Sequence, residues 1–242
     1  MSIKAISFDF WNTLFAEQPG GYAYYSSRRH SLISTAIASF GEFSDDQIAR
    51  ACHDEAAIHY RLWSEEHRTP GAGARLDRIL AKLGVRLGEK NRAALTTAIE
   101  EGVLERPPVL IQGAEDLVRQ LSGKYPLGII SDTGFSPGRV LRQVLDQNDL
   151  FGAFESFVFS DEAGRSKPHL RVFEQTSRKL KAAPGQMIHI GDLEPTDVAG
   201  AKNAGYFAIR FTGVTPMNDG EQTAADRVIT RLSELSGVLD EL

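Results

Sequence analysis

Polar side chains follow apolar runs at four places in this chain. They are Asp9 after AISF, Ser131 and Asp132 after YPLGII, Lys167 after SFVFSDEAGRS, and Asp192 and Asp197 after QMIHIG. Asp9 and Asp192 would offer a divalent cation the oxygen ligands that it prefers, and magnesium needs only one or two carboxylates beside water and substrate phosphate. Lys167 and the Ser131 hydroxyl would contact phosphoryl oxygens. Asp9 could then attack phosphorus and form an aspartyl phosphate that water hydrolyses.

The apolar runs predict strands that are buried on both faces, at residues 3–8, 125–130, 156–160, 186–190 and 206–211. Helical patterns such as AEDLVRQLSGK and HLRVFEQTSRKL separate the later runs. Strands that alternate with helices are typical of a parallel α/β sheet, here of the Rossmann-like kind. Ligands bind beyond the carboxyl ends of such strands, which is where the polar residues gather.

Residues 16–105 interrupt this alternation, because they contain four successive helical patterns and no convincing strand. Ser44 can serve as the N-cap of the second pattern, and glycines and Pro107-Pro108 bound the last two. We therefore predict an all-helical cap domain at 16–105, inserted into an α/β core made of 1–15 and 106–242.

Four segments of the predicted core follow one another in the order of a known set of motifs. FDFWNTL, IISDTG, GRSKPHLRVF and IHIGDLEPTDVAGAKNAG resemble the four motifs of the haloacid dehalogenase-like (HAD) superfamily. The resemblance covers the core nearly end to end, and the helical insertion stands where that family places its C1-type cap. It implies a hydrolase with a magnesium cofactor.

The same resemblance implies a role for each matching residue. Asp9 would be the nucleophile, Ser131 the phosphate-binding hydroxyl and Lys167 the neutralising cation. The residues of the motifs expected to contact substrate are Thr13, Ser131, Asp132 and Lys167. The expected metal ligands are Asp9, the main-chain carbonyl of Trp11, Asp192 and Asp197, the last either as a ligand or as an acid behind the ligands.

Trp11 departs from the pattern of the family's phosphatases, which usually carry a second aspartate at this position as general acid and base. An indole N–H cannot give up its proton in this way. The rate acceleration that a general acid or base provides, about 10²- to 10⁴-fold, must therefore be lost or come from another group. One explanation is a good leaving group, as in an acyl or aryl phosphate. Another is a different acid, with Glu194 and Asp132 nearest in sequence. The third is a reaction other than phosphoryl transfer.

Cleavage of carbon–halogen bonds is the sharpest rival reaction, because dehalogenases of this family place a tyrosine at the position of Trp11. Those enzymes work without a metal and lack the pair Gly191-Asp192, so this pair favours phosphoryl transfer. A phosphonate-cleaving enzyme would need a cap lysine for a Schiff base, and Lys82 and Lys90 stand in exposed helical patterns. The remaining alternative is a binding protein that retains the fold with little turnover.

The start of the insertion, EQPGGYAYYSSRRH, predicts a contribution to substrate choice. Gly20 and Gly21 could act as a hinge, and Arg28 and Arg29 would face the core across the cleft. The alternative is that the tyrosines of this segment pack between cap helices and the arginines are solvated.

Two histidines and the single cysteine favour structural roles. His189 stands between isoleucines in a predicted buried strand, so we expect a hydrogen-bonded core residue. His59 and Cys52 fall in one helical pattern, where a polar face and a half-buried thiol explain them.

Composition limits the partners of this 242-residue chain. A net charge of -5 argues against nucleic acid and anionic membranes. Nowhere do about 18 apolar residues run together, and the N-terminus lacks an apolar stretch of signal-peptide length. We therefore expect a cytoplasmic monomer or homodimer that acts on a small phosphorylated metabolite, whose identity depends on the geometry of the cap.

Overall fold

The computed structural model describes residues 2–242 and contains a parallel sheet of six strands in the order β5-β4-β1-β6-β7-β8. These strands are Ala5–Phe8 (β1), Leu127–Ser131 (β4), Ser156–Phe159 (β5), Met187–Gly191 (β6), Phe207–Phe211 (β7) and Arg227–Ile229 (β8). In the centre of the sheet, Ile6 of β1 is in register with Leu127 on one side and Ile188 on the other. The strand order therefore diverges from β1, and the residue that follows β1 lies where open α/β sheets bind ligands.

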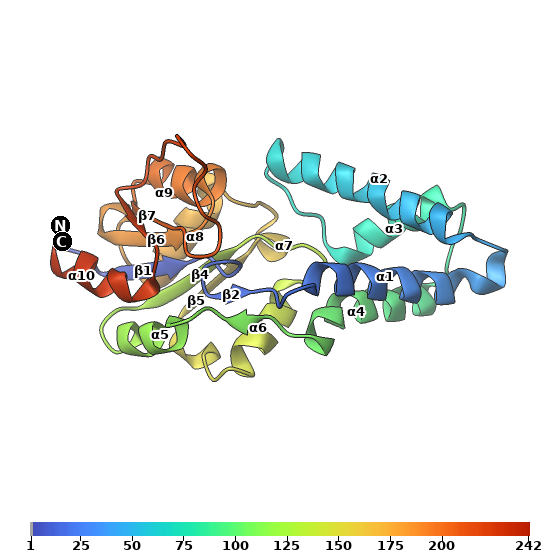
Figure 1. Ribbon diagram of the computed structural model, residues 1–242, viewed down its shortest axis with the longest axis horizontal. Coiled ribbons are helices and arrows are strands. Elements are labelled where there is room, and N and C mark those ends of the chain that lie inside the picture. Colours follow the sequence, from blue (N-terminus) through green and yellow to red (C-terminus); the bar gives the residue numbers. More distant parts are fainter. Residues whose placement is uncertain (1) are drawn as a thin grey trace.

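Helices cover both faces of the sheet (Figure 1). On one face Phe8 packs in a cluster with α5 (Ala114–Ser122), α6 (Gly138–Asp146) and α10 (Leu235–Asp240). On the other face Ala5 packs in a cluster with α8 (Leu170–Leu180) and α9 (Ala199–Asn203). Burial of both faces explains the nearly continuous apolar runs, and the predicted α/β fold is confirmed.

Four long helices follow one another between two short strands and form a separate lobe in Figure 1. They are α1 (Gly21–Ile37), α2 (Asp45–Ser64), α3 (Ala72–Lys82) and α4 (Glu89–Glu105), and we call them the cap. The strands before and after them, β2 (Phe15–Ala16) and β3 (Val109–Leu110), pair antiparallel. Ile33, Ile48, Leu76 and Leu95 belong to an apolar cluster within the cap. The domain boundaries given above stay a prediction, and the cap helices fall within its segment 16–105.

The start of α2 agrees with its sequence signal. The Ser44 hydroxyl accepts from the Gln47 backbone N–H at 3.3 Å, and the Gln47 side chain accepts from the Ser44 backbone N–H at 2.8 Å. Such a capping box satisfies two free amides, and its serine contributes about 1 kcal/mol.

The remaining elements are short. They are η1 (Ala38–Phe40), η2 (Phe151–Ala153), α7 (Ser160–Ala163), η3 (Pro184–Gln186), the π-helical turn η4 (Glu194–Val198) and η5 (Leu232–Glu234). The strands β2, β3 and β8 are absent from the sequence prediction because two or three residues give too little periodicity to detect. Within the described residues, the helices all fall short of the length and hydropathy that a membrane-spanning helix needs.

Candidate active site

The ends of the central strands bring one lysine and three carboxylates together. Asp9 follows β1, Asp192 follows β6, Asp197 lies in η4, and Lys167 reaches them from the segment between α7 and α8. The Lys167 ammonium donates to Asp9 Oδ1 at 2.6 Å and to Asp197 Oδ1 at 2.6 Å. Carboxylate oxygens of Asp9, Asp192 and Asp197 lie within 4.8 Å of one another. We call these four residues the acidic cluster.

Hydrogen bonds divide the carboxylates of the acidic cluster into two kinds. Both oxygens of Asp197 are used, because Oδ1 contacts Lys167 and His189 while Oδ2 accepts from the Leu193 N–H and the Thr196 hydroxyl, each at 3.1 Å. Asp9 Oδ2 accepts no hydrogen bond from residues 2–242. Asp197 is thus fixed by the protein, whereas Asp9 keeps an oxygen for a ligand.

Gly191 makes room for this arrangement. A Cβ at position 191 would collide with the Asp197 side chain, so the end of β6 can approach that carboxylate only with glycine. The pair Gly191-Asp192 therefore combines a steric role with a charged one.

His189 lies behind the acidic cluster and is buried, as predicted for a core histidine. Its Nε2 contacts Asp197 Oδ1 at 3.0 Å and its Nδ1 contacts Ser7 Oγ at 3.0 Å. Asp197 is not predicted as a partner. The sequence carries a signal only for the other partner, because Ser7 and His189 are two polar residues in two predicted buried strands, and the structure opposes them in register.

The pKa shifts in the acidic cluster follow from burial and from its charges. Burial raises the pKa of Asp9 well above its usual value, and Asp197 and Asp192 add to this although Lys167 opposes it. Burial also raises the pKa of Asp192. For Asp197, burial is outweighed by the Lys167 charge and the His189 hydrogen bond, so its pKa is lowered.

This charge balance fits a divalent cation. Burial alone would lower the pKa of Lys167, but Asp197, Asp9 and Asp132 raise it, so the ammonium stays charged. One ammonium still faces the three carboxylates of the acidic cluster, and among the described residues Asp192 accepts hydrogen bonds only from neutral side chains, the Thr215 hydroxyl at 2.7 Å and Asn12. Hard oxygen donors with excess negative charge are what magnesium binds, so the residues present fit that ion.

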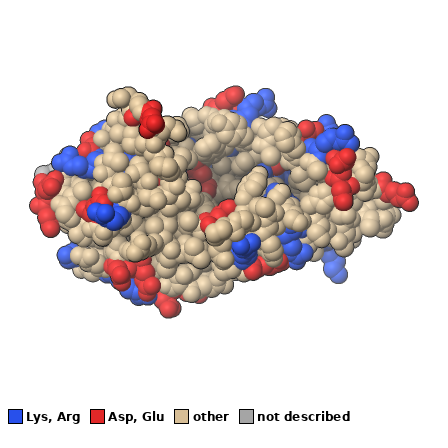
Figure 2. All heavy atoms as spheres, viewed as in Figure 1, with Lys and Arg blue, Asp and Glu red and all other residues tan. Residues whose placement is uncertain are grey.

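A cavity of about 690 Å³ lies between the acidic cluster and the cap. Figure 2 shows the surface hollowed between the two lobes, with acidic side chains visible inside the hollow. The cluster residues line its floor together with Asp132, and all four cap helices contribute to its walls. A volume of this size suits a small-molecule ligand.

Comparison with known proteins decides the family. The sequence model of the haloacid dehalogenase-like hydrolases matches residues 3–205. The chain belongs to the haloacid dehalogenase-like hydrolases. It is therefore an enzyme of the hydrolase class, as the four motifs predict.

Two relatives of this HAD hydrolase are phosphatases. The glyceraldehyde 3-phosphate phosphatase of Methanopyrus kandleri is 32% identical over 99% of this chain and 98% of that protein. The 5-amino-6-(5-phospho-D-ribitylamino)uracil phosphatase YigB of Escherichia coli is 25% identical over 98% of this chain and 96% of that protein. The two names give different substrates, so relationship alone does not supply one.

Two solved structures share the fold of this HAD hydrolase. The 2-haloacid dehalogenase of Pseudomonas syringae covers 99% of both chains with a TM-score of 0.73 and 20% identity. The HAD hydrolase YfnB of Bacillus subtilis, solved with magnesium, covers 99% of this chain and 100% of its own with a TM-score of 0.64 and 20% identity. At these identities the likeness establishes the fold and not the reaction.

Trp11, which stands where the resemblance to the family's phosphatases leads us to expect an acid, lines the cavity of this HAD hydrolase. Its ring packs edge-on against Phe10, with centroids 5.0 Å apart. The two acids that the sequence analysis names as substitutes, Asp132 and Glu194, both accept hydrogen bonds from the protein. Asp132 accepts from the Trp63 indole N–H at 2.8 Å and from the Lys167 backbone N–H at 2.9 Å.

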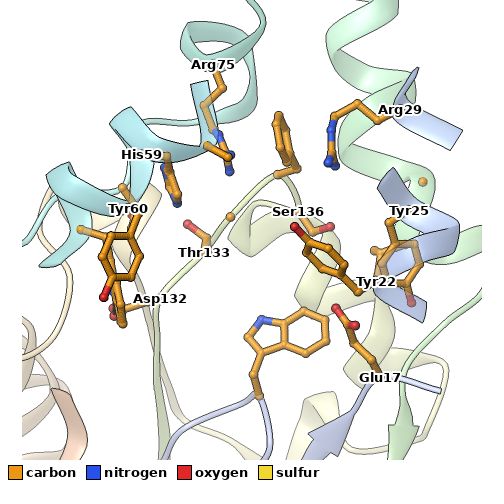
Figure 3. Close-up of a pocket in the computed structure, with 18 of the residues that line it drawn as sticks. Glu17, Tyr22, Tyr25, Arg29, His59, Tyr60, Arg75, Asp132, Thr133 and Ser136 are labelled. Atoms are coloured by element: carbon orange, nitrogen blue, oxygen red, sulfur yellow. Dashed lines mark hydrogen bonds between the residues drawn. The ribbon is translucent and has the colours of Figure 1, made fainter. Parts of the chain in front are cut away.

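Glu194 is engaged at a site outside the cavity lining. It accepts from the Thr223 hydroxyl at 2.6 Å and from the Ala224 backbone N–H at 2.8 Å. Glu17, by contrast, lines the cavity, and burial raises its pKa. In Figure 3 its carboxylate points into the cavity beneath Tyr22. Sequence reasoning missed Glu17, which stands in the segment that links β2 to α1.

The two arginines predicted to contact substrate differ in their surroundings. Arg28 donates to both oxygens of Glu105 at 2.8–2.9 Å, and the Tyr24 hydroxyl donates to the same carboxylate at 2.8 Å. Arg29 instead stacks on the Phe135 ring at 4.1 Å and points into the cavity (Figure 3). Both arginines line the cavity, but Arg28 is already paired.

Two other predicted site residues do not reach the cavity surface. Thr13 and Ser131 are buried and do not line the cavity. The Thr13 hydroxyl has no hydrogen-bond partner among residues 2–242. Lys82 and Lys90 of the cap are exposed and do not line the cavity either, which leaves the Schiff-base alternative without a lysine.

Proposed function

We propose that this HAD hydrolase is a magnesium-dependent phosphatase that acts on a small phosphorylated metabolite through an aspartyl phosphate at Asp9. The observation that carries the proposal is the state of Asp9, which Lys167 holds by Oδ1 while Oδ2 accepts no hydrogen bond from the described chain. A fixed carboxylate with one uncovered oxygen at the floor of a cavity is arranged as a nucleophile. The phosphatase relatives support the reaction class.

In the first step Asp9 Oδ2 forms a bond to phosphorus, and the bond between phosphorus and the leaving-group oxygen breaks with its electron pair on that oxygen. Lys167 offsets the charge of the nucleophile and of the phosphoryl oxygens. In the second step a water oxygen forms a bond to phosphorus, and the bond between phosphorus and Asp9 Oδ2 breaks with its electron pair on the carboxylate. The released phosphate takes up the water's proton, and the Asp9 carboxylate is restored.

Magnesium would be held by Asp9, Asp192 and the main-chain carbonyl of Trp11, and it would offset the charge on the phosphoryl group. Asp197 has both oxygens occupied by protein donors, so we assign it the role of orienting Lys167. Ser131 and Thr13 are assigned to the phosphate side of the site by their motifs alone, because both hydroxyls lie below the cavity surface.

The leaving group needs a proton unless it is a weak base, and Trp11 cannot supply one. We assign this role to Glu17, which lines the cavity and whose pKa is raised by partial burial, although a hydrogen bond from the Tyr22 backbone opposes this shift. Asp132 is less suited, because its carboxylate already accepts hydrogen bonds from Trp63 and Lys167.

The experiment measures phosphate release from p-nitrophenyl phosphate and acetyl phosphate, with magnesium and with EDTA. Chloride release from 2-haloacids is measured in parallel. We expect magnesium-dependent phosphate release that Asp9→Asn abolishes, and no chloride. Chloride release without phosphate release would instead establish the dehalogenase alternative, and silence on both substrates would favour a binding protein.

The proposal also covers location and assembly. We propose a cytoplasmic monomer or homodimer that binds neither nucleic acid nor membrane; the net charge of -5 supports the lack of polyanionic partners, and the single cysteine supports a reducing compartment.

A further inference from the structure

The end of the cavity formed by the cap carries a cationic group that the protein does not neutralise. Arg29 makes no ion pair and no hydrogen bond with any described residue; its ring contact is the face of Phe135, and Glu55 acts on it only through space. Burial lowers its pKa, yet a guanidinium stays charged in proteins. A partly buried charge without a counter-ion is costly, so a ligand that supplies one is favoured.

The neighbouring charges do not offset Arg29. Arg75 stacks on the same Phe135 ring at 3.6 Å, and it pairs with Glu55 through hydrogen bonds of 2.8–3.1 Å. Arg78 also donates to Glu55, at 2.7 Å. The single negative charge of Glu55 is therefore shared by two guanidinium groups before Arg29 is counted.

His59 adds an unsatisfied polar atom to this end of the cavity. It lines the cavity from α2, and its Nδ1 is buried without a hydrogen-bond partner within residues 2–242. Burial, with Arg75 nearby, lowers its pKa to about 4, so the ring is neutral at pH 7. Figure 3 shows Arg29, Arg75 and His59 pointing into the cavity from three helices of the cap.

We propose that the substrate carries a second anionic group, a carboxylate or a second phosphate, which Arg29 binds while the first phosphate lies at Asp9. This inference rests on the proposed function and adds the substrate class. His59 would complete the contact as a neutral hydrogen-bonding group. The phosphate to be cleaved and the second anion would then mark the two ends of the cavity.

Matched substrate pairs test the proposal, because the members of each pair differ by one anionic group. 3-Phosphoglycerate is compared with glycerol 3-phosphate, and 6-phosphogluconate with sorbitol 6-phosphate, so that a terminal carboxylate replaces a hydroxymethyl group at two lengths. Fructose 1,6-bisphosphate is compared with fructose 6-phosphate to test whether the second anionic group is a phosphate. We expect kcat/KM to favour the doubly anionic member of at least one pair by about tenfold or more.

The variant Arg29→Gln should reduce that preference to about one, because the member with the second anionic group loses a contact that the member with one anionic group never makes. Arg29→Lys, which keeps the charge, should restore part of the preference. Arg50→Gln removes the same charge from an exposed position of α2 and serves as the control. Retained turnover of the members with one anionic group shows that the Arg29 variant is folded.

Two results would overturn the inference while leaving the phosphatase proposal intact. One is turnover of the members with one anionic group at rates equal to or above those of the members with two. The other is an equal loss in Arg29→Gln on both members of the preferred pair, which would assign Arg29 to the fold of the cap. Absence of Asp9-dependent phosphate release from every compound would contradict the phosphatase proposal itself.

Discussion

The floor and the cap end of the cavity differ in how far the protein satisfies its own polar groups. At the floor, both oxygens of Asp197 are occupied and Lys167 contacts two carboxylates at 2.6 Å. At the cap end, Arg29 has no counter-ion and His59 Nδ1 has no partner within the described chain. Internal bonds at the floor hold the reacting groups in one geometry, whereas unsatisfied groups at the cap end leave recognition to the ligand.

Among the variants considered, removal of Lys167 from the floor of the cavity should have the largest effect on stability and activity. Lys167→Met leaves the buried carboxylates without their cation, so we expect a loss of about 3–5 kcal/mol in the free energy of unfolding. We also expect kcat to fall by about 10³-fold or more, because the nucleophile is no longer held. Urea unfolding and phosphate release measure the two effects.

Lys202→Met is the matched control, since it removes a lysine from a half-exposed ion pair with Asp226. Its cost should stay at or below about 1 kcal/mol. Equal losses for the two variants would contradict the view that the acidic cluster depends on a buried cation.

Glu17→Gln tests whether the wall of the cavity supplies the missing acid. For an alkyl phosphate we expect kcat to fall by about 10²-fold, because the leaving alkoxide loses its proton donor. For p-nitrophenyl phosphate, whose leaving group is a weak base, the fall should be small. A comparable fall on both substrates would show that Glu17 acts in some way other than proton transfer.

Trp63→Phe tests the hydrogen bond that joins the two regions. Its indole N–H donates from α2 to Asp132 at the end of β4, at 2.8 Å. Loss of a bond to a buried carboxylate should lower the free energy of unfolding by about 1.5–3 kcal/mol. Tyr60→Phe is the control, because it removes an exposed hydroxyl that makes no hydrogen bond to the described chain. Equal free energies of unfolding for the two variants would contradict a stabilising bond between Trp63 and Asp132.

His59 should give the smallest effect, visible as a pH dependence of stability. Its pKa is lowered to about 4 in the folded protein, against about 6.5 in the unfolded chain. Between these values the unfolded chain binds more protons, so stability falls as pH drops from 6.5 toward 4. His59→Gln should reduce that fall by about 1–2 kcal/mol, allowing for partial exposure of the ring.

The measurement compares urea midpoints at pH 7 and pH 5 for the natural protein, His59→Gln and His53→Gln. His53 is an exposed histidine of the same helix, so its variant should keep the natural pH dependence. Identical pH dependence in all three proteins would mean that the His59 ring is not desolvated as described.

The sequence predicted the floor of the cavity better than its walls, for a physical reason. Strands buried on both faces leave apolar runs, and the first polar residue after each run marks a strand end, which located Asp9, Asp192 and Ser131. Parallel pairing then brings those ends together without further information. The α/β fold and the membership of the HAD hydrolases are confirmed, while the roles of the individual site residues and the domain boundaries stay predictions.

The walls depend on contacts between segments that are remote in sequence. Arg28 and Arg29 are adjacent in the chain, and only the packing of α1 against α4 pairs one with Glu105 and leaves the other unpaired. Glu17 carries no motif, and its place in the cavity follows from the link between β2 and α1. The partnership of His189 with Asp197 likewise appears only when β6 and η4 are placed together.

Direct detection of the aspartyl phosphate tests the central claim. The enzyme is mixed with acetyl phosphate and magnesium, quenched in acid within one turnover, digested and analysed by mass spectrometry. We predict a phosphoryl group on the peptide that contains Asp9, formed in the natural protein and absent in Asp9→Asn. Phosphate release that persists in Asp9→Asn, with no phosphoryl group on that peptide in the natural protein, would contradict the account.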